Sequence, residues 1–397
     1  MTCRVETRRE LRFATARAVK QSRRVNRLIT LPRFCAPLIL GLSLAALQTP
    51  GADARTNFAA AGWAEVEITP PLGIGLGGRG GPDTHATKVL DPLYAQILIL
   101  KDAHGTGFVL VSLDVVGIPH TLSEKVRTAI VHELGVDFNL VILNASHTHS
   151  GLYMIRELMA GVGPAPQIET DYHAALAEKL ISAARLAGKK LRPVTVETFR
   201  GTSQVGINRR GTNATGKTAM VPNAKAPINE LVWVLKLTPT DGSAPALVFS
   251  YSCHAVIAYG YANSAISADF PGVARNALRE KLGLAHVQFV QGTAGNVRPR
   301  IVADLEHNRF RAPKPEDLQV AGKQLADDVL AALNTKGDRL ALNLAGASDR
   351  PFFPRGNPPA RAIYEAMAKE PGEFRRAAAE YWLKRYDSGE SFAKGDA

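Results

Sequence analysis

The chain has 397 residues, of which 46% are hydrophobic, 21% charged and 7% aromatic, a composition typical of a globular protein. This composition excludes global disorder and a collagen-like repeat, and three cysteines are too few for a disulfide framework. Most of the net charge of +12 comes from residues 1–33, which hold ten Lys or Arg and two Glu. No run of Lys and Arg is interleaved with aromatic residues, so a nucleic-acid partner is not expected.

Residues 1–54 have the order of a secretory signal segment. A basic stretch precedes an apolar run at 34–47, and Ala52-Asp53-Ala54 follows as a small-x-small cleavage site. The apolar run is shorter than the roughly 20 residues that a membrane-spanning helix needs. We therefore expect cleavage after Ala54 and export to the periplasm or the medium. The alternative is a basic tail that precedes a buried helix.

Residues 55–397 alternate apolar, β-branched runs with helical periodicity. The runs predict strands at 64–68, 95–100, 108–113, 140–143, 194–199, 231–237, 246–251, 287–290 and 340–345. Helices are expected at 123–134, 171–186, 271–282, 315–333 and 373–386, and the segment 201–226 is expected to be a long loop. This order predicts an α/β fold, with a mixed β-sheet core flanked by helices in a single catalytic domain.

Polar residues follow four of the predicted strands at the point where each strand ends. They are Asp114 and the segments 144–151, 252–254 and 291–296. Ligands of open α/β sheets bind at the carboxyl ends of strands, so we expect these residues to lie close together. Taken singly, each of them is also explained as a polar loop residue that caps the next helix. A glycine-rich loop at 73–81 carries no phosphate-binding signature, and we expect it to line the site.

The pair His147 and His149 is the sharpest chemical signal. In extended backbone, residues i and i+2 point to the same side, so both imidazoles are expected to face one pocket. His254, at the end of another strand, is a further candidate ligand for Zn²⁺, which commonly takes three protein ligands at catalytic sites. Asp114 and Asp269 are candidate carboxylate ligands, partners of the histidines or general bases, and Asp269 is equally explained as a helix N-cap.

Several segments, in order, resemble the N-terminal catalytic region of the neutral/alkaline, non-lysosomal ceramidases. The resemblance covers residues 62–300. It rests on 62–71 (GWAEVEITPP), Asp114, 147–151 (HTHSG), 206–209 (GINR), His254, 266–272 (ISADFPG) and 292–299.

The resemblance implies a zinc-dependent amidase that cleaves the amide bond of N-acylsphingosine (ceramide) or a related N-acyl lipid. His147 and His254 match the two histidine ligands of the family, His149 matches a neighbouring catalytic histidine, and Arg209 matches an arginine of the site. A lipid substrate would bring the protein into peripheral contact with a membrane.

The chain departs from the family at 295–300, which reads Gly-Asn-Val-Arg-Pro-Arg. The family has serine, its proposed nucleophile, at the position of Arg298 and aspartate at that of Asn296. Because arginine stays protonated, Arg298 is expected to bind a carboxylate or stabilise an oxyanion, with Asn296 beside it in substrate binding. No counterpart of the family's later Glu and Tyr ligands is recognised after residue 300. Two alternatives are thus a hydrolase of another, acidic amide or ester, and a non-catalytic or truncated relative.

Overall fold

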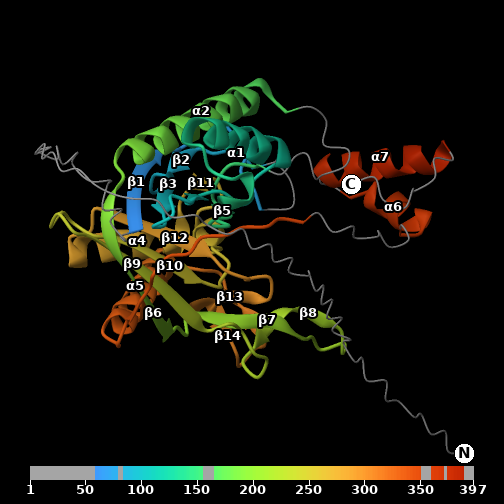
Figure 1. The fold of residues 1–397 in the computed structure, drawn as a ribbon. Coiled ribbons are helices and arrows are strands. Elements are labelled where there is room, and N and C mark those ends of the chain that lie inside the picture. The colour runs from blue at the N-terminus through green and yellow to red at the C-terminus, as the bar shows by residue number, and fades with distance from the viewer. Residues whose placement is uncertain (1–58, 79–83, 155–164, 350–358, 371–372, 389–397) are drawn as a thin grey trace, which may run out of the picture. The chain divides into compact units, whose positions relative to one another are not determined.

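The structure is a computed structural model that describes residues 59–78, 84–154, 165–349, 359–370 and 373–388 (Figure 1). The predicted signal segment 1–54 lies outside these residues and stays a prediction. None of the helices in the described ranges is long and apolar enough to cross a membrane.

The core of the described chain is one mixed sheet with the strand order β12-β10-β9-β6-β1-β3-β4-β5, and β16 pairs with β6. Neighbours are antiparallel except β4–β5 and β10–β12, which are parallel. The predicted α/β fold with a mixed sheet is therefore confirmed. The strands of this sheet are β1 (Ala59–Glu67), β3 (Tyr94–Lys101), β4 (Gly107–Leu113), β5 (Val141–Ala145), β6 (Arg192–Thr202), β9 (Leu231–Pro239), β10 (Ala246–Tyr251), β12 (His286–Gln291) and β16 (Asp338–Arg339).

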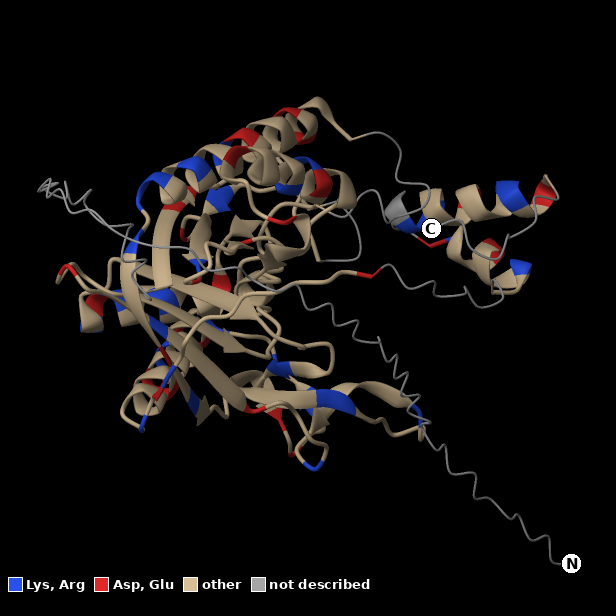
Figure 2. Ribbon diagram, viewed as in Figure 1, with Lys and Arg blue, Asp and Glu red and all other residues tan. Residues whose placement is uncertain are grey.

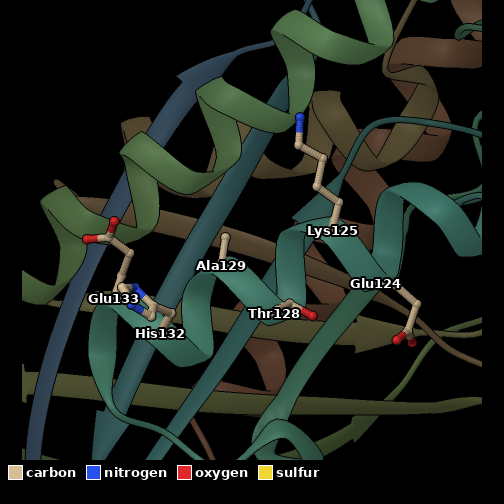
Figure 3. Close-up of a pocket in the computed structure, with 6 residues that line it drawn as sticks. All are labelled: Glu124, Lys125, Thr128, Ala129, His132 and Glu133. Carbon is tan, nitrogen blue, oxygen red and sulfur yellow. The ribbon is translucent and has the colours of Figure 1, made fainter.

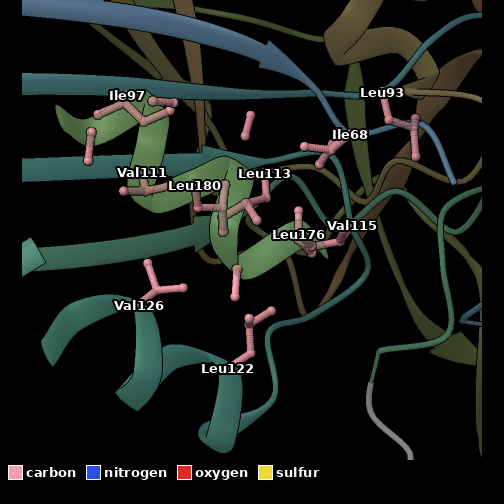
Figure 4. Packing of buried hydrophobic residues seen from close by; sticks show 14 of the residues in the cluster. Ile68, Leu93, Ile97, Val111, Leu113, Val115, Leu122, Val126, Leu176 and Leu180 are labelled. Carbon is pink, nitrogen blue, oxygen red and sulfur yellow. The ribbon is translucent and has the colours of Figure 1, made fainter. Parts of the chain in front are cut away.

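Two helices cover one half of the sheet. They are α1 (His120–Leu134) and α2 (Gln167–Lys189); α2 packs on β1 and β3, and α1 packs on α2 and β5 (Figures 1 and 4). Figure 4 shows Leu122 and Val126 of α1 and Leu180 of α2 meeting Val111 of β4 in this apolar cluster. Burying such side chains contributes about 1.5–3 kcal/mol each, which fixes the helices on this face.

The other half of the sheet is covered by α4 (Asp269–Leu282) and α5 (Pro315–Leu333). Leu278 of α4 and Leu325 of α5 pack with Phe249 and Phe289 of the parallel strands β10 and β12. The helix α5 has the bounds expected from its sequence, and α4 ends as expected at Gly283, which has the left-handed conformation that favours glycine.

The inner faces of the two halves meet around a buried polar side chain, Gln288 of β12. Its amide donates to Ser112 Oγ at 3.0 Å and to the Gln96 carbonyl at 3.3 Å. The strands β12 and β5 stand at opposite ends of the strand order, yet Gln291 N of β12 donates a hydrogen bond to Asn144 Oδ1 of β5 at 2.9 Å. The sheet thus folds back on itself and brings together the carboxyl ends of β5 and β12.

Three expectations about the elements are wrong. The segment 201–226 is mostly a hairpin of β7 (Gly206–Thr212) and β8 (Thr218–Asn223), because β7 finds pairing partners on both sides in β8 and β13 (Val297–Pro299). Residues 340–345 form no strand, although Leu342 and Leu344 still pack on the inner face. The helix α1 begins at His120, three residues before the expected start at 123.

The remaining elements are short or lie late in the chain. The predicted helix at 373–386 is present as α7 (Glu373–Asp387), and Tyr364 of α6 (Arg361–Met367) stacks on its Trp382 at 6.0 Å between ring centroids. The others are β2 (Lys88–Val89), β11 (Ala265–Ile266), β14 (Ala303–Asp304), β15 (Arg309–Phe310) and the one-turn α3 (Ala258–Tyr261).

Candidate metal centre

Three histidines from two distant parts of the chain meet at the carboxyl edge of the sheet. His147 and His149 follow β5, and His254 follows β10. One ring nitrogen of each lies within 4.8 Å of the others. The expectation that His147 and His149 face one pocket is met, but its reason is wrong, because His147 has a φ of +62° and is not extended. A turn, and not strand alternation, brings the pair together.

Backbone carbonyl groups set the tautomer of all three rings. Each Nδ1 lies at hydrogen-bond distance from a carbonyl oxygen and therefore carries the proton, which leaves Nε2 with a free electron pair. This pattern is typical of histidines that bind metal through Nε2. The Nδ1 contacts are His147 to Val116 O (2.6 Å), His149 to Gly78 O (2.7 Å), and His254 to Ala294 O (2.8 Å) and Val297 O (3.1 Å).

The spacing of the nitrogens suits a tetrahedral ion. The Nε2 atoms of His147 and His149 are 3.3 Å apart. Metal–nitrogen bonds of 2.0–2.1 Å at tetrahedral angles place two ligand nitrogens about 3.3 Å apart. The third ligand nitrogen, from His254, lies within 4.8 Å of these two, and three imidazole ligands would leave the fourth position of a tetrahedron for water or substrate. Three neutral nitrogen donors suit Zn²⁺, so these residues fit the ion that the resemblance implies.

The three histidines are held neutral by their surroundings. Burial is the main cause that lowers the pKa of each, to about 3 for His149 and about 4 for His254. The positive charge of Arg209 lowers all three pKa values further. A histidine with a pKa of about 3 is a poor proton acceptor at neutral pH but a ready metal ligand, which favours His149 as a third ligand over the proton-transferring neighbour expected from the sequence.

One turn, 294–297, connects the histidines with Arg209 of β7. Its carbonyl groups Ala294 O and Val297 O bind the His254 ring. In the same turn, Gly295 O accepts a hydrogen bond from Arg209 Nε at 3.3 Å, and Asn296 O accepts one from the Arg209 backbone N–H. The side chain of Asn296 donates to Pro227 O at 3.5 Å. Arg209 therefore lies near the three histidines, where the resemblance implies an arginine.

Asp114 has a different environment from the one expected for a ligand or a base. Its carboxylate is fully buried and accepts two hydrogen bonds from Arg275 of α4, at 2.7 and 2.6 Å. A third comes from the backbone N–H of Tyr94. Its oxygens are thus committed to an ion pair that joins β4 to α4. Asp114 supports the site indirectly, because Val115 O, next in the chain, accepts a hydrogen bond from His147 N.

Asp269 is also committed to backbone groups. It has a φ of +57°, and its carboxylate accepts hydrogen bonds from the N–H groups of Ile257 and Ala258 at 2.8 Å each, and from Phe270 N. These bonds hold the segment that follows His254 against the start of α4. The N-cap interpretation is thus close to what the structure shows, although Asp269 is the first residue of α4 and Ala268 precedes it as the cap.

Asp269 is expected to make folding stability depend on pH. Burial raises its pKa from 3.8 to about 6, so the folded state binds its proton more tightly than the unfolded state does. The contribution of Asp269 to the free energy of unfolding is therefore fully present below about pH 4. It is lost as pH rises through 6, and the total loss is about 3 kcal/mol. In Asp269→Asn this loss should disappear, measured by urea unfolding with chelator at pH 4 to 7. Asp91, whose pKa burial also raises, and the buried histidines, whose pKa values burial lowers, titrate in both proteins, the histidines with the opposite sign. The measured quantity is therefore the difference in slope between Asp269→Asn and the wild type. The exposed Asp338→Asn should behave as wild type, and an unchanged slope in Asp269→Asn would contradict the assignment.

Two residues at the site were missed by the sequence analysis. Tyr259 of α3 lies with its ring centroid 5.8 Å from that of His149. Gly78 supplies the carbonyl group for His149, and a Cβ at Gly78 would come within 2.5 Å of the His149 ring. The glycine-rich loop 73–81 was the available signal for Gly78, and its described part does line the site. Tyr259 carries no signal beyond its place five residues after His254.

Gly78→Ala is expected to weaken metal binding by about 10–100-fold, the usual effect of disturbing the partner that orients a ligand. The added methyl group collides with His149, and the φ of +78° is strained for alanine. Gly73→Ala is the matched control, since Gly73 has a φ of +88° and nothing within 4 Å of its Cβ position. Both variants should lose stability through the positive φ, and Gly78→Ala should lose more through the collision, but only Gly78→Ala should lose zinc affinity in a chelator competition titration. Equal affinities would contradict this role of Gly78.

A separate hollow of about 520 Å³ lies on the exposed face of α1 (Figure 3). It is lined by Glu124, Lys125, Thr128, Ala129, His132 and Glu133, and none of the three site histidines contributes to it. Cys253, beside His254 in sequence, is fully buried, and burial raises the pKa of its thiol well above the usual value. Its thiol therefore stays protonated at neutral pH, which makes it a poor metal ligand.

Comparison with solved structures assigns the fold. Neutral ceramidase from Pseudomonas aeruginosa matches 70% of this chain with a TM-score of 0.57 and 17% sequence identity. This chain has a neutral ceramidase-like fold. A structure of ceramidase complexed with C2 matches the same share of the chain with a TM-score of 0.57 and 18% identity. The chain spans under half of these ceramidases, 45% and 44% of their lengths. No protein-family model matches the sequence, and no curated protein does.

Proposed function

We propose that this neutral ceramidase-like chain is a zinc-dependent amidohydrolase that cleaves the amide bond of ceramide or a related N-acyl lipid. The observation that carries the proposal is the convergence of three neutral imidazoles, each with Nδ1 bound to a backbone carbonyl, at the sheet edge of this fold. The fold alone would not support an activity, since one fold serves many functions.

In the proposed reaction, His147, His149 and His254 hold the ion, which supplies Lewis acidity toward the amide carbonyl when bound. Water adds to the carbonyl carbon, the C–N bond breaks, and the amine leaves with a proton, so that a fatty acid and an amine such as sphingosine are formed. We assign Arg209 to substrate binding, because the turn that binds His254 also binds Arg209. Arg298 cannot act as the nucleophile, which favours direct attack by water.

Export and membrane contact belong to the same proposal. An exported enzyme that acts on N-acyl lipids would meet its substrate at a lipid surface. The support for export is the order of basic, apolar and small residues in the segment 1–54.

The test measures zinc and hydrolysis on the same purified protein. We expect about one zinc per chain by elemental analysis, and release of sphingosine from ceramide that stops on dialysis against a chelator and returns with zinc. A folded protein that takes up no zinc would overturn the metal centre and favour a non-catalytic relative. Zinc binding without hydrolysis of any N-acyl lipid would retain the centre and overturn the proposed reaction.

A further inference from the structure

A second arginine lies next to Arg209 on the neighbouring strand. In the β7–β13 register, Val297 is opposite Asn208 and Arg298 is opposite Ile207. Arg209 lies one step beyond Asn208, so Arg209 and Arg298 are diagonal neighbours across the two strands, about 7–8 Å apart at the backbone. Figure 2 shows this cationic region on β7, beyond the large sheet. The resemblance to ceramidases implies only the first of these arginines, because Arg298 stands where the family has serine.

Neither arginine has a carboxylate partner among the described residues. The ion pairs in this part of the chain include neither Arg209 nor Arg298. Arg209 donates one hydrogen bond, from Nε to Gly295 O. Arg298 is bound mainly by soft groups, with Nη1 3.4 Å from Met220 Sδ and the guanidinium 4.9 Å from the centroid of the Phe310 ring. Its Nε atom is buried without a hydrogen-bond partner.

Two guanidinium groups that lie together without an anion repel each other. The charge of Arg298 lowers the pKa of Arg209, as does the partial burial of Arg209. The three histidines add no negative charge, and a bound zinc ion would add two positive charges beside them. An anion at this place would therefore relieve repulsion and satisfy N–H donors that the protein leaves open, which is the usual reason for paired arginines at carboxylate and phosphate sites.

We infer that Arg209 and Arg298 bind an anionic group of the substrate, a carboxylate or a phosphate, beside the amide bond that is cleaved. The inference rests on the proposed function and narrows its substrate class to acidic N-acyl compounds, such as N-acyl amino acids. The turn 294–297 provides the connection, because its carbonyl groups bind both His254 and Arg209. The anion thus lies within one turn of the metal ligands, close enough to belong to the same small substrate.

The test compares three probes that share one acyl chain and differ in one group. N-lauroylglycine carries a carboxylate, N-lauroylethanolamine is its neutral counterpart, and N-lauroylethanolamine O-phosphate carries a phosphate. Binding is measured by calorimetry on the metal-free full chain, below the critical micelle concentration, and hydrolysis is measured on the zinc-loaded protein. We expect an anionic probe to bind at least about 10-fold more tightly than the neutral one, with a preference that falls as salt rises. The probe that binds more tightly, carboxylate or phosphate, identifies the anionic group that the two arginines recognise.

Arg298→Gln should reduce this preference about 10-fold or more, while Arg298→Lys keeps the charge and should retain part of it. Arg300→Gln is the control. It removes the same charge only two residues from Arg298, and the Arg300 side chain is already bound to Gln204. Equal binding of charged and neutral probes by the wild type, or an unchanged preference in a folded Arg298→Gln, would overturn the inference. Selective binding of an anion without hydrolysis would keep the anion site and count against the proposed function instead.

Discussion

His254→Ala is expected to lower zinc affinity by more than about 100-fold and to remove measurable amide hydrolysis. Loss of a residue that merely orients a ligand costs 10–100-fold, and His254 is placed as a ligand itself. The remaining two imidazoles cannot close the site, and no carboxylate joins the three histidines in the described chain. Elemental analysis and competition with a chelating dye measure the effect, and circular dichroism shows whether the variant is folded.

The same experiment on His149→Ala decides between two views of that residue. The resemblance to ceramidases implies a two-histidine shell with His149 beside it, whereas the geometry places its Nε2 3.3 Å from that of His147 as a third ligand. If His149 is a ligand, His149→Ala should lower zinc affinity as much as His254→Ala does. As a neighbour, it should leave zinc in place and reduce hydrolysis alone. The exposed His132→Ala should change neither property, and full zinc affinity in His254→Ala would place the metal elsewhere.

Asp114→Asn is expected to destabilise the protein by about 3–5 kcal/mol, because it leaves the buried charge of Arg275 without its partner. Both side chains are almost inaccessible, with relative exposures of 0% for Asp114 and 4% for Arg275. Their ion pair fixes α4 to the end of β4, next to Val115, whose carbonyl group accepts a hydrogen bond from His147 N. Urea unfolding at pH 7 with chelator present measures the change without a contribution from metal binding.

The chain contains a matched control for this ion pair. Arg185 also donates two hydrogen bonds to one carboxylate, that of Glu133, at 3.0 and 2.7 Å, but at the surface and through Nε and Nη2. Glu133→Gln should therefore cost much less stability than Asp114→Asn, because water and salt screen an exposed ion pair. The double variant Asp114→Leu with Arg275→Met should recover much of the stability lost in Asp114→Asn, because it removes both charges together. A cost for Asp114→Asn near that of Glu133→Gln would show that the buried pair contributes little.

The sequence determines the elements where local signals agree. The helix α5 has the predicted bounds 315–333, since proline at the start and an apolar face agree with its tertiary packing. The strand β10 also has the predicted bounds 246–251. The hairpin of β7 and β8 was missed because glycine, asparagine and lysine are poor strand formers. Pairing with β13 overrides that weak local preference.

The sequence also identified the three histidines, because polar residues that follow apolar strands stand out by their position, whereas Arg209 was identified only through the resemblance to ceramidases. Their convergence was decided by tertiary structure alone. His147 and His254 are 107 residues apart, and only the strand order and the turn 294–297 bring their rings to a centroid distance of 4.6 Å. The backbone carbonyls that fix their tautomers carry no side-chain signal in a sequence. Asp114 shows the reverse case. Its place at a strand end suggested a catalytic or metal-binding role, but its carboxylate is bound to Arg275, 161 residues away, in an ion pair that stabilises the fold. Local pattern thus marks where polar groups leave the sheet, whereas long-range packing decides which of them face one another.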